Sequence, residues 1–163
     1  MAADPFQPLL DDHDEFLEKL TELEAVLDEM INTREANEGN RELLDESLRF
    51  FQEELLPHFR VEDEFVLPPL EAAIGRYGTL VNVVAYEHEE VRREIVKFRE
   101  ARAQLDASKD AWPAIQELNR HGVFTIQFLW DHFRKEKMSL FPTARTALKA
   151  DQLAAIAAGL VQP

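Results

Sequence analysis

The chain of 163 residues carries 18 Lys and Arg against 32 Asp and Glu, a formal charge of −14, and 45% of its residues are hydrophobic. This length and apolar content fit one domain over residues 1–163, and the negative charge argues against nucleic acid and anionic membranes as partners. Because cysteine is absent, disulfides, thiolate zinc sites, cysteine nucleophiles and Cys-ligated iron–sulfur clusters are excluded, and any metal must be held by nitrogen and oxygen.

The sequence also lacks the signals of secretion and of membrane insertion. The segment from Met1 to Phe16 has neither the basic start nor the apolar stretch of a signal peptide. The longest apolar run, from Ala154 to Val161, is too short to cross a bilayer. We therefore expect a cytoplasmic protein.

Apolar residues recur at alternating spacings of three and four in four long segments, which is typical of helices that bury one stripe. In chain order, the stripes run from His13 to Met30, Leu44 to Phe65, Val81 to Phe98 and Ile115 to Glu136. The sequence shows no strand-like alternation. These features predict an all-α fold, an up-down-up-down antiparallel four-helix bundle over about residues 10–142.

The ends of these helices are predicted from capping and turn residues. Asp11 and Asp12 suit the N-cap of the first helix. Turn chemistry predicts the later breaks at Asn37–Asn40, Pro68–Gly78, Ser108–Pro113 and Pro142. Pro57 lies inside the second helix, where it should free a carbonyl one turn back and bend the axis. The tail, residues 143–163, predicts one or two short helices, which either cap the bundle or form a homodimer contact.

A repeat links the two halves of the chain. The segments HFRVEDEFVLP (58–68) and HFRKEKMSLFP (132–142) share the frame HFRxExxxxxP at an offset of 74 residues. The segments DHDE (12–15) and EHEE (87–90) align at an offset of 75. The chain therefore reads as a helical hairpin used twice, and pseudo-twofold packing of the hairpins would bring two single histidines and two His/Glu pairs to one level.

Each HxxxE pair places an imidazole and a carboxylate one turn apart on the apolar face of its helix. A buried Glu is costly there unless it is protonated, hydrogen-bonded or bound to metal. Ion pairs with Arg60 and Arg134 are a poor alternative, because those arginines are two residues away and project elsewhere. Imidazole and carboxylate suit iron, manganese or zinc. The predicted metal ligands are His13, His58, Glu62, His88, His132 and Glu136.

His121 has no counterpart in the repeat and lies about three turns, ~16 Å, before His132. We interpret it as a histidine at a helix end or one that supports a ligand, and not as a ligand. Gly122 and Thr125 fit a narrow route to the metals, although a close helix crossing explains Gly122 equally well.

With its doubled HxxxE motif followed by Leu67-Pro68 and Phe141-Pro142, the sequence resembles the hemerythrin-like, or HHE cation-binding, family over about residues 13–141. The resemblance implies a four-helix bundle around two iron ions that are joined by an oxo or hydroxo bridge and two carboxylates. The resemblance implies that four histidines each bind one iron: His13, His58, His88 and His132. It implies that Glu62 and Glu136 bridge the two irons.

Oxygen-carrying hemerythrins have a second histidine four residues along the third helix, where this chain has Arg92. The resemblance then implies two histidines per iron and an open position on each metal, which favours reactivity or sensing over oxygen storage. The expected function is to bind or reduce a small ligand such as dioxygen, nitric oxide or peroxide. The alternatives are an iron/oxygen or redox sensor that acts through metal-dependent folding and a partner contact, and a structural zinc-binding bundle. Whether the protein turns over a substrate is left open.

Overall fold

The computed structural model describes residues 3–160, which form helices joined by short turns and contain no strand. The first and third helical rods are continuous α-helices, α1 (Gln7–Thr33) and α5 (Leu80–Ala107). The second rod consists of α2 (Glu38–Phe50), the π-helical turn η1 (Phe51–Leu55), α3 (Leu56–Val61), the π-helical turn η2 (Glu62–Val66) and α4 (Leu67–Ile74). The fourth consists of α6 (Trp112–Lys135), η3 (Glu136–Leu140) and α7 (Phe141–Ala147), and α8 (Ala150–Leu160) follows.

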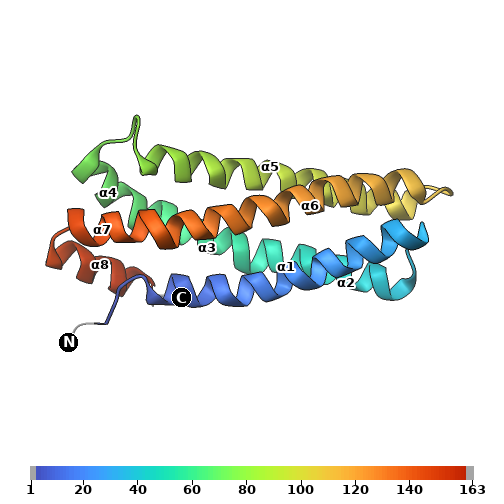
Figure 1. Cartoon of the computed structure of the whole chain (residues 1–163), viewed down its shortest axis with the longest axis horizontal. Helices are drawn as coiled ribbons and strands as arrows, with labels where there is room; N and C mark the ends of the chain where they lie inside the picture. Colours follow the sequence, from blue (N-terminus) through green and yellow to red (C-terminus); the bar gives the residue numbers. More distant parts are fainter. Residues whose placement is uncertain (1–2, 161–163) are drawn as a thin grey trace.

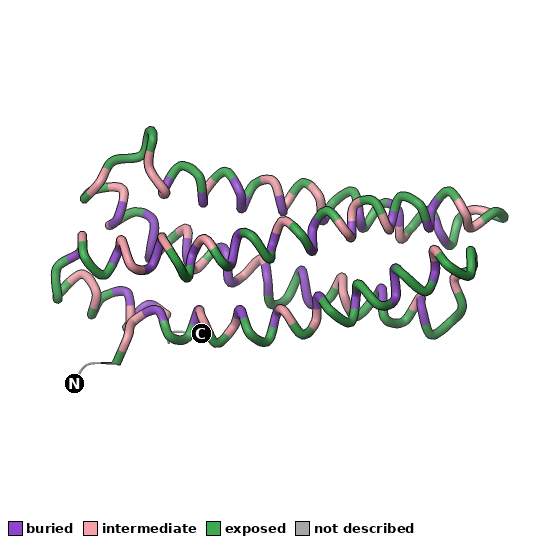
Figure 2. The backbone as a smooth tube through the Cα atoms, in the orientation of Figure 1, coloured by how far each residue is buried: buried purple, intermediate pink, exposed green. Residues whose placement is uncertain are grey.

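The rods lie lengthwise beside one another (Figure 1). α1 packs against α2 and α6, and α5 packs against α6 and α4. Each rod turns a buried stripe inward and an exposed face outward (Figure 2), as the spacing of apolar residues predicts. The described residues therefore confirm the all-helical class. Within them, no helix combines the length and the apolar character needed to cross a bilayer.

The turn chemistry explains two of the helix starts. Asn37 caps α2 with a reciprocal capping box, because its side chain accepts from the Asn40 N–H and the Asn40 side chain accepts from the Asn37 N–H. Pro113 lies in the first turn of α6, where its missing N–H costs no bond. The N-cap predicted at Asp11 and Asp12 is wrong, since α1 begins at Gln7 and contains both residues.

Three π-helical turns each end one residue before an X-Pro bond. In each turn the residue before the proline donates its N–H to the carbonyl five residues back: Leu56 to Phe51, Leu67 to Glu62 and Phe141 to Glu136. Proline has no N–H, and its ring clashes with the carbonyl one α-turn back. The wider π turn therefore carries the helix past the proline.

These turns correct two predicted helix ends. Pro68 and Pro142 do not break their helices, which continue to Ile74 and Ala147. The second rod ends at Gly75, which lies inside the predicted break at Pro68–Gly78 and has a positive φ of 83°. The bundle rods thus extend beyond the predicted limits of residues 10–142. At Pro57 the predicted irregularity is present as η1.

The tail contains one separate helix, α8, and residues 161–163 lie outside the described part of the chain. α8 packs on η2, and its Ile156 belongs to a buried apolar cluster with Leu9, Val66 and Phe141. The tail therefore caps one end of the helical rods. Among the two expectations for the tail, this supports capping, while the homodimer contact stays a prediction.

Two separate apolar clusters form the core, and the predicted ligands lie between them. The larger cluster includes Phe16, Phe59, Val91 and Phe133, and the smaller one includes Leu9, Val66, Val84 and Leu140. Along the helices, four of the ligands separate a residue of the larger cluster from a residue of the smaller one. These four ligands are His13, Glu62, His88 and Glu136. The six predicted ligands thus form a buried polar layer inside an otherwise apolar core.

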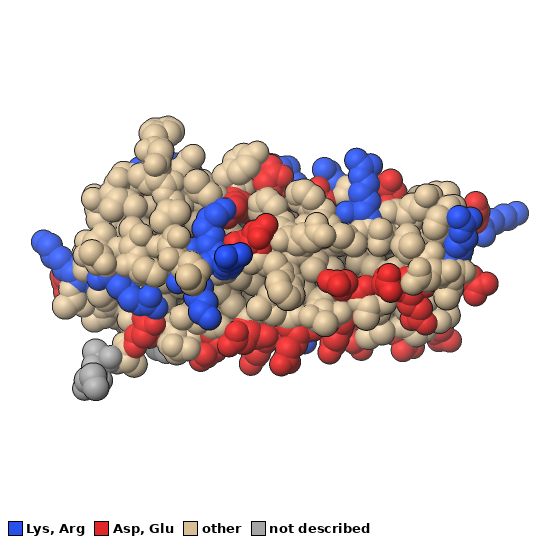
Figure 3. Space-filling model, in the orientation of Figure 1, with Lys and Arg blue, Asp and Glu red and all other residues tan. Residues whose placement is uncertain are grey.

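The acidic character of the chain is on its surface. On the face drawn in Figure 3, acidic side chains follow α1 along the lower edge, and basic side chains gather in smaller groups. Most of the charge of −14 is therefore solvated, and only a few carboxylates are buried in the core.

Candidate metal centre

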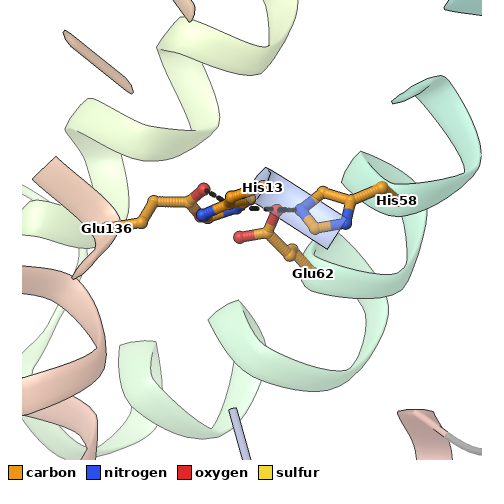
Figure 4. Close-up of side chains that lie close together, drawn as sticks. All are labelled: His13, His58, Glu62 and Glu136. Carbon is orange, nitrogen blue, oxygen red and sulfur yellow. Dashed lines mark hydrogen bonds and ion pairs between the residues drawn. The ribbon is translucent and has the colours of Figure 1, made fainter. Parts of the chain in front are cut away.

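The structure brings all six predicted ligand side chains together. One group of four consists of His13, His58, Glu62 and Glu136, whose donor atoms all lie within 4.8 Å of one another (Figure 4). A second group of four, with the same spacing, consists of Glu62, His88, His132 and Glu136. Both glutamates belong to both groups, and each lone-histidine helix and each HxxxE helix supplies ligands. The arrangement thus offers two adjacent positions that share two carboxylates.

The donor atoms are buried, and most of them lack hydrogen-bond partners. The exceptions are the Nε2 atoms of His13 and His58, which lie 3.3 Å from each other. The six residues are between 0% and 4% exposed. Both carboxylate oxygens of Glu62 and of Glu136 and the Nε2 atoms of His88 and His132 have no hydrogen-bond partner. Several nitrogens and oxygens are nevertheless close: His58 Nε2 lies 2.8 Å from Glu62 Oε1, and His132 Nε2 lies 3.1 Å from Glu136 Oε1. Buried polar atoms that approach one another without hydrogen bonds fit donors aimed at a common cation.

The opposite ring nitrogens of three histidines donate to carboxylates. His58 Nδ1 is 2.9 Å from an Asp12 oxygen. His88 Nδ1 is 2.7 Å from an Asp63 oxygen, and His132 Nδ1 is 3.0 Å from a Glu87 oxygen. A proton on Nδ1 leaves the Nε2 lone pair free and fixes the orientation of the ring, as in many metal-binding histidines.

Asp12 and Glu87 directly precede the single histidines of the repeat, so the acidic residue in that motif was a usable signal. Asp63 also contacts Arg92, with 2.6 Å between the guanidinium and the second carboxylate oxygen. Arg92, four residues after His88, therefore acts on His88 through Asp63. Neither the doubled HxxxE motif nor the apolar stripes predicted the supporting roles of these residues.

Without metal, the close charges redistribute protons within the centre. Burial alone would lower the pKa of His58, but the carboxylates of Glu62 and Asp12 raise it to about 9. Burial and the neighbouring His58 cation lower the pKa of His13 to about 4. Burial would raise the pKa of Glu62, but the same cation and the other histidines lower it to about 2. In the metal-free centre, His58 is therefore protonated and paired with Glu62.

His121 lies outside both groups of four. Its Nδ1 is 2.6 Å from the largely buried Glu94 and its Nε2 is 3.1 Å from the exposed Glu117, so both ring nitrogens face carboxylates outside the centre. It lies inside α6 and contacts no carboxylate that supports a predicted ligand, so both roles expected for it are wrong.

Gly122 marks a close helix crossing and not a route to the metals. A Cβ atom at Gly122 would lie 2.6 Å from Leu27 Cδ1 and 3.2 Å from Phe98 Cε2, so α1 and α5 fill the space beside it. Thr125 donates its hydroxyl to the His121 carbonyl within α6. Both residues are therefore part of the packing of the core.

The donor set fits a metal pair. Four imidazoles and two carboxylates, all nitrogen and oxygen donors, match the preferences of iron, manganese and zinc, and a carboxylate can join two ions. A family model described as the hemerythrin HHE cation binding domain matches residues 4–144. No curated protein matches the chain. The matched region contains all six buried donors, and the chain belongs to the hemerythrin HHE cation-binding domain family.

Proposed function

We propose that the protein is an up-down-up-down four-helix bundle with a non-haem di-iron centre that binds or reduces a small ligand such as dioxygen, nitric oxide or peroxide. His13 and His58 would hold one iron, His88 and His132 would hold the other, and Glu62 and Glu136 would bridge them. A pair of iron ions supplies two exchangeable electrons and open coordination positions at such a site.

The observation that carries this proposal is the sharing of two carboxylates between two groups of four donors. Glu62 and Glu136 each lie at 0% exposure with both oxygens unbonded. Two buried carboxylates beside a single protonated histidine are costly, and a pair of cations between them offsets that cost. A mononuclear site would leave two of the four histidines without a role.

The surrounding side chains restrict what reaches the centre. Leu55, Val84, Val91 and Leu129 are at most 1% exposed, and Leu17 is partly buried beside them. An apolar wall of this kind keeps out water and large anions and admits only small neutral ligands through side-chain motion. Asp12, Asp63 and Glu87 hold the imidazole rings with their Nε2 atoms facing inward.

A surface pocket of 390 Å³ between α1 and α6 is not the ligand site. Its lining includes Thr21, Asp28, Asn119 and Val123 and none of the six donors. Thr21, for example, lies eight residues from His13 along α1, which is a separation of about 12 Å along the helix axis. We place the chemistry at the buried centre because the convergent unbonded donors are there.

Metal analysis of protein purified without added metal, combined with its optical spectrum, tests the proposal. We expect about two irons per chain, with charge-transfer absorption. Glu62→Ala and Glu136→Ala should each abolish the two-metal site, and the control His121→Ala should keep its stoichiometry. If zinc alone is found and ferrous iron added under argon does not bind, the di-iron function is wrong.

A second candidate function, metal-dependent sensing through the tail, is favoured by one contact. Gly159 of α8 lies so close to η2 that a Cβ there would be 2.5 Å from Phe65 Cδ1. Glu62 begins η2, so a change in the bridge would be transmitted to the surface on which α8 packs. A partner that recognises displaced α8 would then report metal loss.

Limited proteolysis with and without a chelator tests this second function. We expect α8 to be cleaved faster than α5 once the metal is removed, because the two carboxylates repel one another and loosen η2. Equal cleavage of α8 in both states would contradict the sensor function without affecting the di-iron proposal.

A further inference from the structure

We infer that the two metal positions hold their ions unequally, and that the position of His13 and His58 releases its metal first. The inference rests on the proposed dinuclear function. Both positions share Glu62 and Glu136 and each has two histidines. The difference between them that carries the inference lies in the groups behind the histidines.

At the position of His88 and His132, both rings are held by anchored carboxylates. Asp63 accepts from His88 at 2.7 Å and is itself held by Arg92 at 2.6 Å. Glu87 accepts from His132 at 3.0 Å and is itself paired with Lys135. Each imidazole is thus held by a carboxylate that is itself held by a cation. Both carboxylates are partly buried, since the side chain of Asp63 is 30% exposed and that of Glu87 is 12% exposed.

At the position of His13 and His58, this support is incomplete. Asp12 accepts from His58 at 2.9 Å, but its side chain is 46% exposed. Within the described residues, His58 is the only ion-pair partner of Asp12. The one carboxylate paired with His13 over the same residues is Glu136, which faces its Nε2 at 3.3 Å. No carboxylate of the described chain therefore orients His13 from its Nδ1 side.

The repeat shows where the missing support would be. At the offset of 74 residues, the counterpart of Asp63 is Lys137, an exposed base, and the counterpart of Lys135 is Val61. At the offset of 75, the counterpart of Arg92 is Leu17. All three differences remove polar support from the same position. The repeat and the observed contacts thus indicate the same difference, which is weaker polar support at the position of His13 and His58.

The expected size of this asymmetry follows from metal sites in general. A hydrogen-bonded partner behind a metal-binding histidine fixes the ring and raises its basicity, and its loss lowers metal affinity by roughly 10–100-fold. His13 lacks such a partner. The two ions should therefore leave at rates that differ by about 10-fold or more.

Release of ferrous iron to an excess of a coloured chelator under argon tests the inference on the full chain loaded with two irons. We expect two phases of one iron each. Asp12→Asn should accelerate the fast phase only, and Asp63→Asn should accelerate the slow phase by about 10-fold. Lys137→Asp, which offers His13 a carboxylate, should slow the fast phase.

Glu64→Gln is the matched control, because Glu64 is exposed and its substitution removes the same charge in the same turn as Asp63. It should leave both phases unchanged. Release of both irons in one phase, or acceleration of the fast phase by Asp63→Asn, would overturn the inference while the dinuclear function stands. A chain that takes up no iron would overturn both.

Discussion

The ring of Phe133 lies flat against the ring of His13, with centroids 4.3 Å apart and an angle of 18° between the planes. Phe59 stacks on His88 in the same way, at 4.2 Å and 15°. Each phenylalanine follows the histidine of an HxxxE motif and packs against the single histidine of the other hairpin. The phenylalanine of the repeated HFRxE frame therefore packs against a predicted ligand from the other half of the chain.

Replacing Phe133 by Leu should release His13 from this stack. Since His13 has no carboxylate behind it, we expect Phe133→Leu to accelerate iron release more than Phe59→Leu, whose histidine is also held by Asp63. Both variants should lower the free energy of unfolding by about 1–2 kcal/mol through lost packing. Chelator competition and urea unfolding measure the two effects separately.

Phe98→Leu is the control for this pair, because Phe98 is 1% exposed in the larger apolar cluster and stacks on no histidine. It should cost a similar amount of stability and leave iron release unchanged. If Phe98→Leu accelerates iron release as much as Phe133→Leu, the stack has no positioning role.

The positions of the six predicted ligands could be predicted because helical periodicity and the repeat constrain them together. An apolar stripe of period 3.6 determines which side chains face inward. The similar lengths of the two hairpins place those side chains at the same level along the bundle axis. The contact from Asp63 to His88 could not be predicted, because it depends on how two rods are rotated about their axes. Its repeat counterpart, Lys137, shows that the motif alone does not specify such a contact.

The helix ends predicted at Pro68 and Pro142 were wrong for a local reason. The rule that proline breaks a helix assumes an α-helical turn before it. Here the carbonyls of Glu62 and Glu136 accept hydrogen bonds from the N–H groups five residues later in the chain. The resulting π turn lets the helix continue through the proline. The buried packing of Val66, Leu67, Leu140 and Phe141 around these turns holds the helices in place.

Glu136→Gln should stabilise the metal-free protein. The nitrogens nearest to Glu136 belong to His13 and His132, whose pKa values are lowered chiefly by burial, so neither ring offers it a positive charge at neutral pH. A neutral amide can donate hydrogen bonds to these rings and places no charge in the core, for a gain of about 1–3 kcal/mol. Urea unfolding in the presence of a chelator measures the gain.

Glu62→Gln is the matched comparison, because Glu62 faces the protonated His58. Its substitution breaks a buried ion pair and should lower stability under the same conditions. Both variants should bind less iron. A metal-free Glu136→Gln protein that is less stable than the native chain would contradict the assignment of charges in the centre.

Metal uptake should release the proton of His58 near pH 7.5. The pKa of His58 is raised to about 9 in the metal-free protein, so this ring is protonated at that pH and must lose its proton to bind metal. His13, with a pKa of about 4, and Glu62, with a pKa of about 2, need no deprotonation. Affinity should therefore rise by up to about tenfold per pH unit below pH 9.

Calorimetric titrations in two buffers of different protonation enthalpy count the released proton. Asp12→Asn removes one of the two carboxylates that raise the pKa of His58, so it should reduce the proton count at the same pH. His121→Ala, which alters a histidine outside the centre, should not change it. A heat of binding that is independent of the buffer would show that His58 is already neutral.

The same carboxylates make the metal-free fold depend on pH. A folded-state pKa of about 9 for His58, above its ordinary value of 6.5, stabilises the fold fully below about pH 6.5, and this contribution is lost as the pH rises through 9. Glu62, lowered to about 2 from 4.5, stabilises the fold above about pH 4.5, and its contribution is lost as the pH falls through 2. His13, whose pKa is lowered to about 4, acts in the opposite direction and costs stability as the pH falls below about 6.5. The metal-free protein should therefore be most stable near pH 6.5, as urea unfolding at several pH values would reveal.

Gly159→Ala should detach α8 from η2. A Cβ at this position would lie 2.5 Å from Phe65 Cδ1 and 2.9 Å from two further ring atoms, so the ring or the helix must move. Intrinsic helix propensity acts in the opposite direction, because Ala favours a helix over Gly by about 1 kcal/mol. Faster hydrogen exchange in α8 of the variant would therefore report the lost contact.

Ala158→Ser is the control, because Ala158 lies on the exposed side of α8, and it should not change the exchange. Combining Gly159→Ala with Phe65→Ala should restore the packing of α8, because the smaller side chain vacates the space. Unchanged exchange in Gly159→Ala would mean that η2 absorbs the added methyl group and that α8 is not coupled to it.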